Sequence, residues 1–267
     1  MSTEARIEAA KAFLLDAPPG EATEVFEDIK AVVDNEAAIV EGVQAAFEQY
    51  NTEQFATVKL EGVGRQVVVS PYNALGTSRF YDAEAGVAFE IDHQTLAVTG
   101  TEPYERDVAE STTALAADVA GYVAEHFDEP SAYGVFEQGD GSVAVVIVAS
   151  KFSPGNYWNG RWRSSYVVRD GAVAGTVAVD VHYFEDGNVR LTTTKAVDVA
   201  AAGNAGRAIA AAERAYQEEL NRAFGGLSDG AFKGLRRQLP VTRSKIEWGK
   251  AIGSYRLGQD IGGGRSK

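Results

Sequence analysis

Two Asp-Gly pairs interrupt a long run of β-branched residues, and this pattern limits the possible folds more than any other feature of the sequence. They lie in RDGA (169–172) and EDGN (185–188). Asp-Gly between β-like segments is a strong hairpin signal. Because successive hairpins place neighbouring strands antiparallel, the pattern predicts a β-meander rather than a parallel sheet with crossover helices. The predicted strands are SVAVVIVAS (142–150), RSSYVVR (163–169), AVAGTVAVDVHYF (172–184) and NVRLTTT (188–194).

Apolar residues recur at helical spacing on both sides of this run. Three N-terminal segments, within 4–15, 25–33 and 39–50, predict an antiparallel three-helix stalk, and DAPPG (16–20) ends the first of them. A further helix is expected over 107–127. A long helix over 205–224 should cover one face of the sheet with a single apolar stripe. The stripe consists of Ile209, Ala212, Tyr216, Leu220 and Phe224.

Shorter β-like runs fill the middle of the chain, at 56–60, 65–70 and 87–92. The order of helices, strands and helix predicts the α+β class. We expect four parts in the chain. They are a helical stalk (1–55), a mixed middle region (56–130), the antiparallel sheet with its covering helix (131–232) and a basic C-terminal arm (233–267).

No arrangement of residues typical of enzyme chemistry appears. The chain has no Cys, which excludes disulfides, thiolate metal sites and a Cys nucleophile. His93, His126 and His182 lack zinc-site spacing, and structural roles are expected for them. No nucleophile elbow, P-loop or dinucleotide fingerprint occurs. We therefore expect no catalytic activity, cofactor or metal. Without a signal peptide or an apolar membrane span, an intracellular location is expected.

The aromatic stretch NYWNGRWRSSY (156–166) admits two interpretations. Trp and Arg could stack on bases or sugars. The favoured interpretation is that Asn-Gly forms a turn and that the Trp residues pack at the edge of the sheet.

Charge is distributed unevenly along the chain. The net charge is −13, yet residues 233–267 carry +7 and the preceding residues carry −20. An acidic body argues against general nucleic-acid binding. A basic end on an acidic body suggests an electrostatically steered contact.

The basic end also has the pattern of an amphipathic helix. Pro240 breaks any preceding helix, and Ser244 with Glu247 forms a capping-box pattern. An apolar stripe follows, made of Trp248, Ala251, Ile252 and Tyr255. Such a helix could dock on its own domain, or bind an acidic protein surface, an anionic membrane or a calmodulin-like groove.

Several blocks along the chain resemble the alpha subunit of the F-actin capping protein. They are FLLDAPPGE (13–21), AFEQYNTEQF (46–55), GTSRFYD (76–82), WNGRWRS (158–164), VHYFEDGNV (181–189) and LRRQLPVTRSKIEW (235–248). The resemblance implies an obligate heterodimer with a beta subunit of similar fold, whose sheet continues the sheet of this chain. It further implies calcium-independent binding to the barbed end of the actin filament, where the dimer blocks subunit addition and loss, in the cytoplasm and cytoskeleton.

The resemblance also implies which residues contact actin. The family's basic contacts fall on Lys233, Arg237 and Arg243, and its aromatic anchor falls on Trp248. Ile252 and Tyr255 would join Trp248 in an apolar groove of actin. Phosphoinositide and protein inhibitors are implied at the same basic surface. The alternative hypothesis is a scaffold or phosphoinositide-binding module at the membrane surface.

Overall fold

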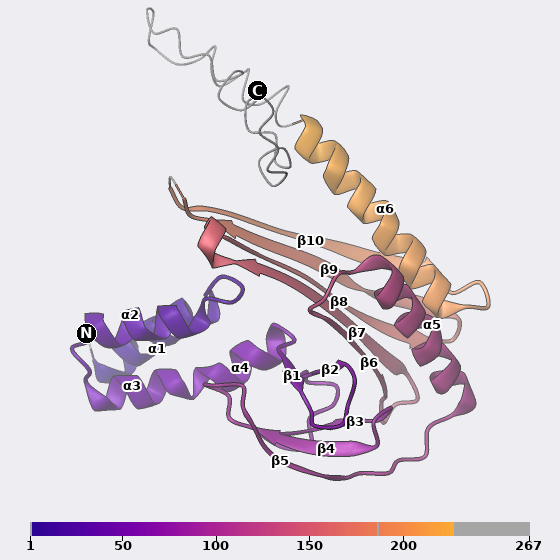
Figure 1. Cartoon of the computed structure of the whole chain (residues 1–267), viewed down its shortest axis with the longest axis horizontal. Helices are drawn as coiled ribbons and strands as arrows, with labels where there is room; N and C mark the ends of the chain where they lie inside the picture. Colours follow the sequence, from indigo (N-terminus) through magenta and orange to yellow (C-terminus); the bar gives the residue numbers. More distant parts are fainter. Residues whose placement is uncertain (1, 186, 227–267) are drawn as a thin grey trace, which may run out of the picture. The chain divides into compact units, whose positions relative to one another are not determined.

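The computed structural model describes residues 2–185 and 187–226. Four helices come first, then two small sheets, a helix, a five-stranded sheet and a final helix (Figure 1). The expected combination of helices and strands in one chain is confirmed. In the described residues, no helix is both long enough and apolar enough to cross a membrane.

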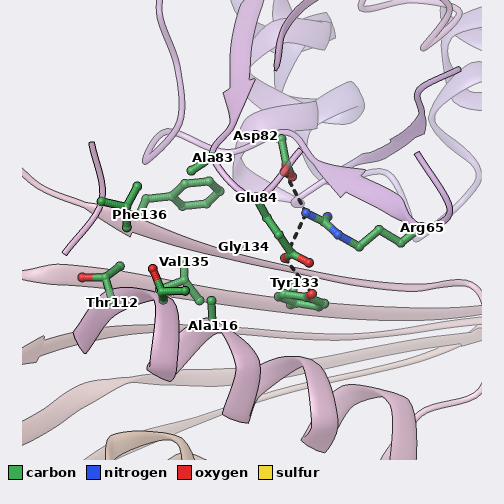
Figure 2. Close-up of a pocket in the computed structure, with 12 residues that line it drawn as sticks. Arg65, Asp82, Ala83, Glu84, Thr112, Ala116, Tyr133, Gly134, Val135 and Phe136 are labelled. Atoms are coloured by element: carbon green, nitrogen blue, oxygen red, sulfur yellow. Dashed lines mark hydrogen bonds and ion pairs between the residues drawn. The ribbon is translucent and has the colours of Figure 1, made fainter. Parts of the chain in front are cut away.

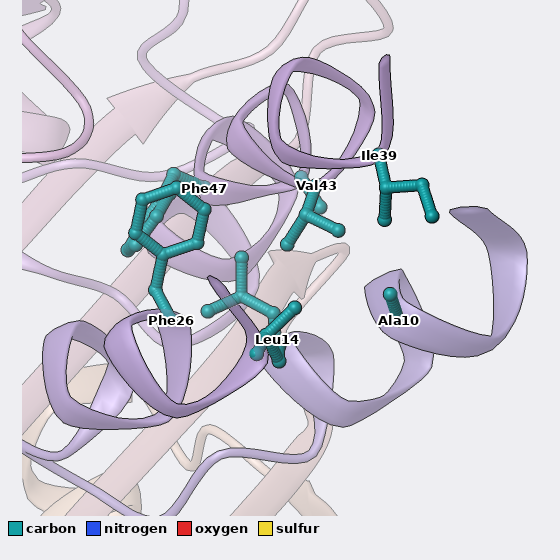
Figure 3. Close-up of a cluster of buried hydrophobic side chains, with 8 residues drawn as sticks. Ala10, Leu14, Phe26, Ile39, Val43 and Phe47 are labelled. Carbon is teal, nitrogen blue, oxygen red and sulfur yellow. The ribbon is translucent and has the colours of Figure 1, made fainter. Parts of the chain in front are cut away.

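The N-terminal helices are α1 (Thr3–Leu15), α2 (Ala22–Val32), α3 (Ala37–Gln44) and α4 (Ala46–Glu53). Their apolar faces share one core, in which Leu14, Ile39 and Val43 are fully buried and Phe26 packs edge-on against Phe47 with ring centroids 5.2 Å apart (Figure 3).

The prediction of three helices in this region is wrong, because the third segment forms two. Ala45, with φ −63° and ψ −21°, separates α3 from α4. This ψ is typical of a 3₁₀ turn, so the helical hydrogen-bond ladder is interrupted although the chain remains right-handed. A single tightened helical turn does not change the spacing of the apolar residues. The sequence pattern therefore continues across Ala45 as if the two helices were one.

The middle region contains two small antiparallel sheets, of which the sequence predicted only some strands. One pairs β1 (Thr57–Lys59) with β2 (Gln66–Val68). The other has the order β3 (Arg79–Asp82), β4 (Val87–Ile91) and β5 (Val98–Pro103). The sequence reading missed β3 and β5, since four- to six-residue strands of mixed polarity carry little periodic signal.

The main sheet is an antiparallel meander in the order β10-β9-β8-β7-β6. Its strands are β6 (Ser131–Glu137), β7 (Val143–Ser153), β8 (Trp158–Arg169), β9 (Ala172–Tyr183) and β10 (Val189–Ala200). The hairpin β8–β9 turns at the Asp170-Gly171 pair, and β9 pairs with β10 from Tyr183 and Val189 onward.

The predicted turn at Asn159-Gly160 is wrong, because both residues lie inside β8. The chain instead turns at the 3₁₀ segment η1 (Pro154–Asn156), followed by Tyr157 at φ 60°. Asn159 accepts a hydrogen bond from the Ser153 backbone N–H at 3.2 Å, which ties the two sides of this turn together. Pro at the first position of the turn is the local signal that outweighs Asn-Gly.

Each face of the main sheet is covered by different elements (Figure 1). Side chains alternate along a strand, so Trp162, Ser164 and Tyr166 of β8 share one face. This face packs against α5 (Glu110–His126) and the first part of α6 (Ala205–Gly226). Asn159, Arg161 and Arg163 point to the other face, where they bond to the N-terminal helical region.

The buried stripe of α6 differs from the predicted one. Ile209 and Tyr216 are buried as expected, but the third large buried side chain is Glu213 rather than Ala212, and Phe224 is 48% exposed. A buried carboxyl group in a helix follows no apolar pattern, so the sequence could not indicate it.

Candidate subunit interface

The outer edge of β10 is open within the described part of the chain. All of its 12 residues pair with β9, and no other described strand pairs with it. The Ala201 N–H donates to the Gly171 carbonyl at 2.7 Å, which marks this residue pair as a hydrogen-bonded one. Because such pairs alternate in an antiparallel ladder, Thr192, Thr194 and Ala196 direct their backbone groups away from β9. A long edge of this kind is a template for pairing with another chain.

The opposite edge, at β6, is covered by the chain itself. Tyr133 of β6 donates a hydrogen bond to Glu84 at 2.7 Å, and Arg65 bridges Asp82 at 2.7 Å and Glu84 at 3.2 Å (Figure 2). The helix α5 also packs along β6. Of the two edges of this sheet, only that of β10 is left open by the elements that the structure describes.

An apolar surface adjoins the open edge on the helix-covered face. The strand register places Trp158, Tyr183 and Val189 in one cross-strand row and Val181 beside Leu191 in the next. Tyr183 is 39% exposed and Val189 is 62% exposed. Apolar side chains concentrated beside an unpaired edge are typical of a surface that another subunit covers.

The helix α6 covers this face of the sheet from the next cross-strand row, which contains Thr193 and Trp162. The hydroxyl groups of Tyr216 on α6 and Thr193 on β10 lie 3.0 Å apart, and the Tyr216 ring lies 5.8 Å from that of Trp162. Thr193 is one row beyond Leu191, so Tyr216 marks where the covered part of the face meets the apolar surface.

A buried carboxyl group joins α6 to α5 and to the main sheet. Glu213 accepts hydrogen bonds from Ser164 at 2.5 Å, Tyr166 at 2.8 Å and Tyr122 at 2.9 Å. Burial raises the pKa of Glu213 above its usual value, although its hydroxyl donors act in the opposite sense. The three donors come from α5 and β8, so one side chain links both helices to the sheet.

On the other face, the DAPPGE segment between α1 and α2 is joined to three strands. Asp16 pairs with Arg190 at 3.0 Å, and Glu21 accepts hydrogen bonds from Asn159 at 2.7 Å and His182 at 2.8 Å. Three of the blocks that resemble the capping protein family, 13–21, 158–164 and 181–189, therefore meet at one joint. The structural role expected for His182 agrees with this position.

The pKa of His182 reflects these contacts. Burial lowers it, but hydrogen bonds to Asn188 and Glu21 outweigh that effect and raise the pKa above its usual value. Both ring nitrogens then act as donors, as in the protonated imidazole.

All the site residues predicted from the sequence lie outside the described residues. They are Lys233, Arg237, Arg243, Trp248, Ile252 and Tyr255. Their role in contacting actin stays a prediction. The residues that the sequence reading missed, above all Glu213 and the Asp16–Arg190 pair, become recognisable only when the sheet brings distant segments together.

These features are typical of a class of protein: an assembling subunit with an open sheet edge on which another chain can pair. The family model described as F-actin capping protein alpha subunit matches residues 10–260. A protein of Chaetomium thermophilum named F-actin-capping protein subunit alpha is 48% identical, over 100% of both chains. The protein of that name from Gibberella zeae is also 48% identical, over 98% of both chains.

A solved structure supports the fold. The homodimeric actin capping protein alpha subunit from Plasmodium berghei matches with a TM-score of 0.71 and 20% identity, covering 91% of this chain and 100% of that one. The family model and the full-length relatives show that the chain belongs to the F-actin capping protein alpha subunit family.

Proposed function

We propose that this chain is the alpha subunit of a heterodimer that caps the barbed ends of actin filaments. The observation that carries the proposal is its match to the alpha-subunit family from residue 10 to residue 260. The heterodimer would block subunit addition and loss at the barbed end without calcium, as a binding protein of the cytoplasm and cytoskeleton rather than an enzyme.

The beta subunit is proposed to pair with β10. The open edge would gain a ladder of backbone hydrogen bonds, and the apolar surface around Tyr183 and Val189 would be covered. Together these provide the edge and the buried area of an obligate interface. The two sheets would then form one continuous antiparallel sheet.

The C-terminal segment is proposed to provide the contact with actin. Lys233, Arg237 and Arg243 would bind acidic groups, since Arg and Lys form charge-assisted hydrogen bonds with carboxylates. Trp248, Ile252 and Tyr255 would occupy an apolar groove. The four parts predicted from the sequence, 1–55, 56–130, 131–232 and 233–267, are retained as a proposal, in which the C-terminal arm begins at Lys233. Phosphoinositide and protein inhibitors would compete at this basic surface.

Seeded actin growth tests the proposed function directly. The chain is co-expressed with a beta subunit, and elongation from filament seeds is followed at about micromolar dimer and below. Barbed-end growth should stop while pointed-end growth continues. Unimpeded barbed-end growth would rule the function out. Vesicle sedimentation across a salt series tests the alternative scaffold, which binds anionic lipid and leaves filament ends unaffected; family membership favours capping.

A further inference from the structure

A cavity of about 370 Å³ lies on the face of the main sheet opposite α6. It is bounded by the start of α2, the end of α4, the β1–β2 pair, the turn after β4, and strands β7 and β8. All these elements belong to this chain. The volume suits a small organic molecule.

The charge of the lining is unusual for so acidic a protein. Arg161 is the only Lys or Arg among the described lining residues, and no Asp or Glu lines the cavity. The guanidinium group makes long contacts from Nε to the Ser150 hydroxyl at 3.3 Å and from Nη1 to the Gln54 carbonyl at 3.4 Å, and it also interacts with the hydroxyl of Tyr50. No carboxylate among the described residues forms a salt bridge with it.

The carboxylate that acts on Arg161, that of Asp180, is already paired with another arginine. Asp180 acts on it electrostatically, but that carboxylate is held by Arg190 at 2.7 and 3.0 Å. Burial accordingly lowers the pKa of Arg161 below its usual value. A partly buried cation without its own anion is stabilised by any anion that enters the cavity.

Other polar groups in the lining are left as donors. Gln94 uses its side-chain oxygen to accept from Gln44 at 2.8 Å, and Gln66 uses its oxygen to accept from Thr57. The amide nitrogens of Gln94 and Gln66 therefore remain available to donate.

The first turn of α2 also borders the cavity. Ala22 and Thr23 line it, and the N-cap residue Glu21 makes no side-chain capping bond because its carboxylate is bound by His182 and Asn159. Free N–H groups at a helix start favour negative charge. This end of the helix therefore favours an anion, as Arg161 does.

Another cavity lined by an Arg has a different charge balance. It measures about 250 Å³, and its Arg65 is paired with Asp82 and Glu84 (Figure 2). With two carboxylates beside one guanidinium, that cavity has no unmatched positive charge. Arg65 therefore serves as an internal control for Arg161.

We propose that the Arg161 cavity binds a small organic anion through a carboxylate or phosphate group. The anionic group would lie against the guanidinium, which binds such groups through two hydrogen bonds. The apolar body of the ligand would pack against Phe152, whose ring lies 5.7 Å from the Arg161 guanidinium, and against Phe47 and Leu96 across the cavity.

The test uses the purified heterodimer and four probes: phenyl phosphate, benzoate, inorganic phosphate and uncharged benzyl alcohol. Binding is measured by calorimetry and by saturation-transfer NMR. Phenyl phosphate or benzoate should bind at least about tenfold more tightly than benzyl alcohol. The order of phenyl phosphate and benzoate identifies the preferred anion, and inorganic phosphate measures the contribution of the charged group alone.

Two variants locate the site. Arg161→Gln removes the cation, and Gln94→Glu places a carboxylate in the cavity; each should weaken binding at least about tenfold. Gln94 lies in the turn after β4, so this variant remains informative if Arg161→Gln does not fold. Arg65→Gln should leave the affinity unchanged.

Three outcomes would overturn the proposal. They are no probe binding at about millimolar concentrations, equal binding by Gln94→Glu and wild type, or an equal loss in Arg65→Gln. In the first case, binding of an acidic peptide would identify the cavity as a protein-docking site.

Discussion

Glu213 of α6 accepts a hydrogen bond from Tyr166 of β8 at 2.8 Å, in a position where the carboxyl side chain is fully buried. The helix that crosses the sheet is thereby fixed by a polar contact at the centre of an apolar face. Such a contact favours one rotation of the helix, because another rotation would leave the buried carboxyl group and its hydroxyl donors without each other.

Replacing Glu213 should show how much this hydrogen-bonded contact contributes to the free energy of unfolding. Glu213→Leu leaves the hydroxyls of Tyr122, Ser164 and Tyr166 buried without their acceptor, and should lower the free energy of unfolding by about 3 kcal/mol. Glu213→Gln keeps an acceptor and should lower it by about 1 kcal/mol. Urea unfolding of the heterodimer at one fixed concentration measures both. The same loss in the two variants would contradict the role of the acceptor.

A glycine in β9 permits close packing of β8. A Cβ at Gly175 would lie 2.0 Å from the Ser165 carbonyl oxygen and 2.7 Å from Tyr166 Cα, both backbone atoms. Gly175→Ala should therefore destabilise the fold by about 3 kcal/mol. Gly160→Ala is the matched control in the same sheet, because its nearest neighbour would be a Val181 methyl group at 3.6 Å. Thermal unfolding distinguishes them, and equal melting temperatures would refute the steric argument.

Proline at the open edge should disturb assembly. Thr194 directs its backbone N–H away from β9, so Thr194→Pro removes an interchain donor and leaves the β9 ladder in place. We expect at least about tenfold weaker association with the beta subunit, measured by co-purification and dilution-induced dissociation.

The control for this variant lies on β5, an edge strand of a smaller sheet among the described strands. Tyr104 N–H bonds to Gly86 O, which places Thr101 of β5 in an outward-facing position. Thr101→Pro should leave association unchanged, since no partner is proposed there. If Thr101→Pro weakens association as much as Thr194→Pro does, β10 is not the pairing edge.

The contact between His182 and Glu21 should make stability depend on pH. Burial lowers the His182 pKa, but the bonds to Asn188 and Glu21 raise it above its usual value on balance. Their stabilisation is fully present below the unfolded pKa of about 6.5 and is lost as pH rises through the folded pKa. Denaturation from about pH 6 to about pH 9 should show the advantage of wild type over His182→Gln shrinking as pH rises.

The remaining groups around His182 define the control for this experiment. Arg190 opposes protonation electrostatically, while Glu21 favours it. Glu21→Gln should therefore flatten the pH dependence and keep a hydrogen-bonding group at that position. If the free energy of unfolding differs between wild type and His182→Gln by the same amount at every pH, protonation of His182 does not contribute to stability.

The basic triad should dominate binding to actin. Changing Lys233, Arg237 and Arg243 together to Ala should weaken capping more than about tenfold in the seeded growth assay, with the heterodimer intact. The charge-matched control changes Lys245, Lys250 and Arg256 to Ala, which removes three positive charges from the same segment. Equal effects of the two triple variants would show that total charge, rather than these three positions, provides the binding.

The sequence by itself determined the parts of the fold that depend on local patterns. Alternating β-branched residues with Asp-Gly turns predicted four of the five strands of the main sheet, β7 to β10, and helical spacing predicted α1, α2, α5 and α6. The first strand, β6, was not named in the prediction. The basic end and its apolar stripe were likewise visible as charge and periodicity. Interruptions that leave the apolar pattern intact, such as Ala45, and short strands such as β3 were beyond this kind of reasoning.

Only the tertiary structure decided which distant residues meet. Glu213 with Tyr166, Asp16 with Arg190, and Arg161 without a carboxylate partner are relations between segments far apart in the chain. The physical reason is that a buried charge or polar group is stabilised by the partners that folding places around it, and no local pattern encodes those partners. The openness of β10 also became visible only in three dimensions, because an edge exists only once the order of the strands is fixed.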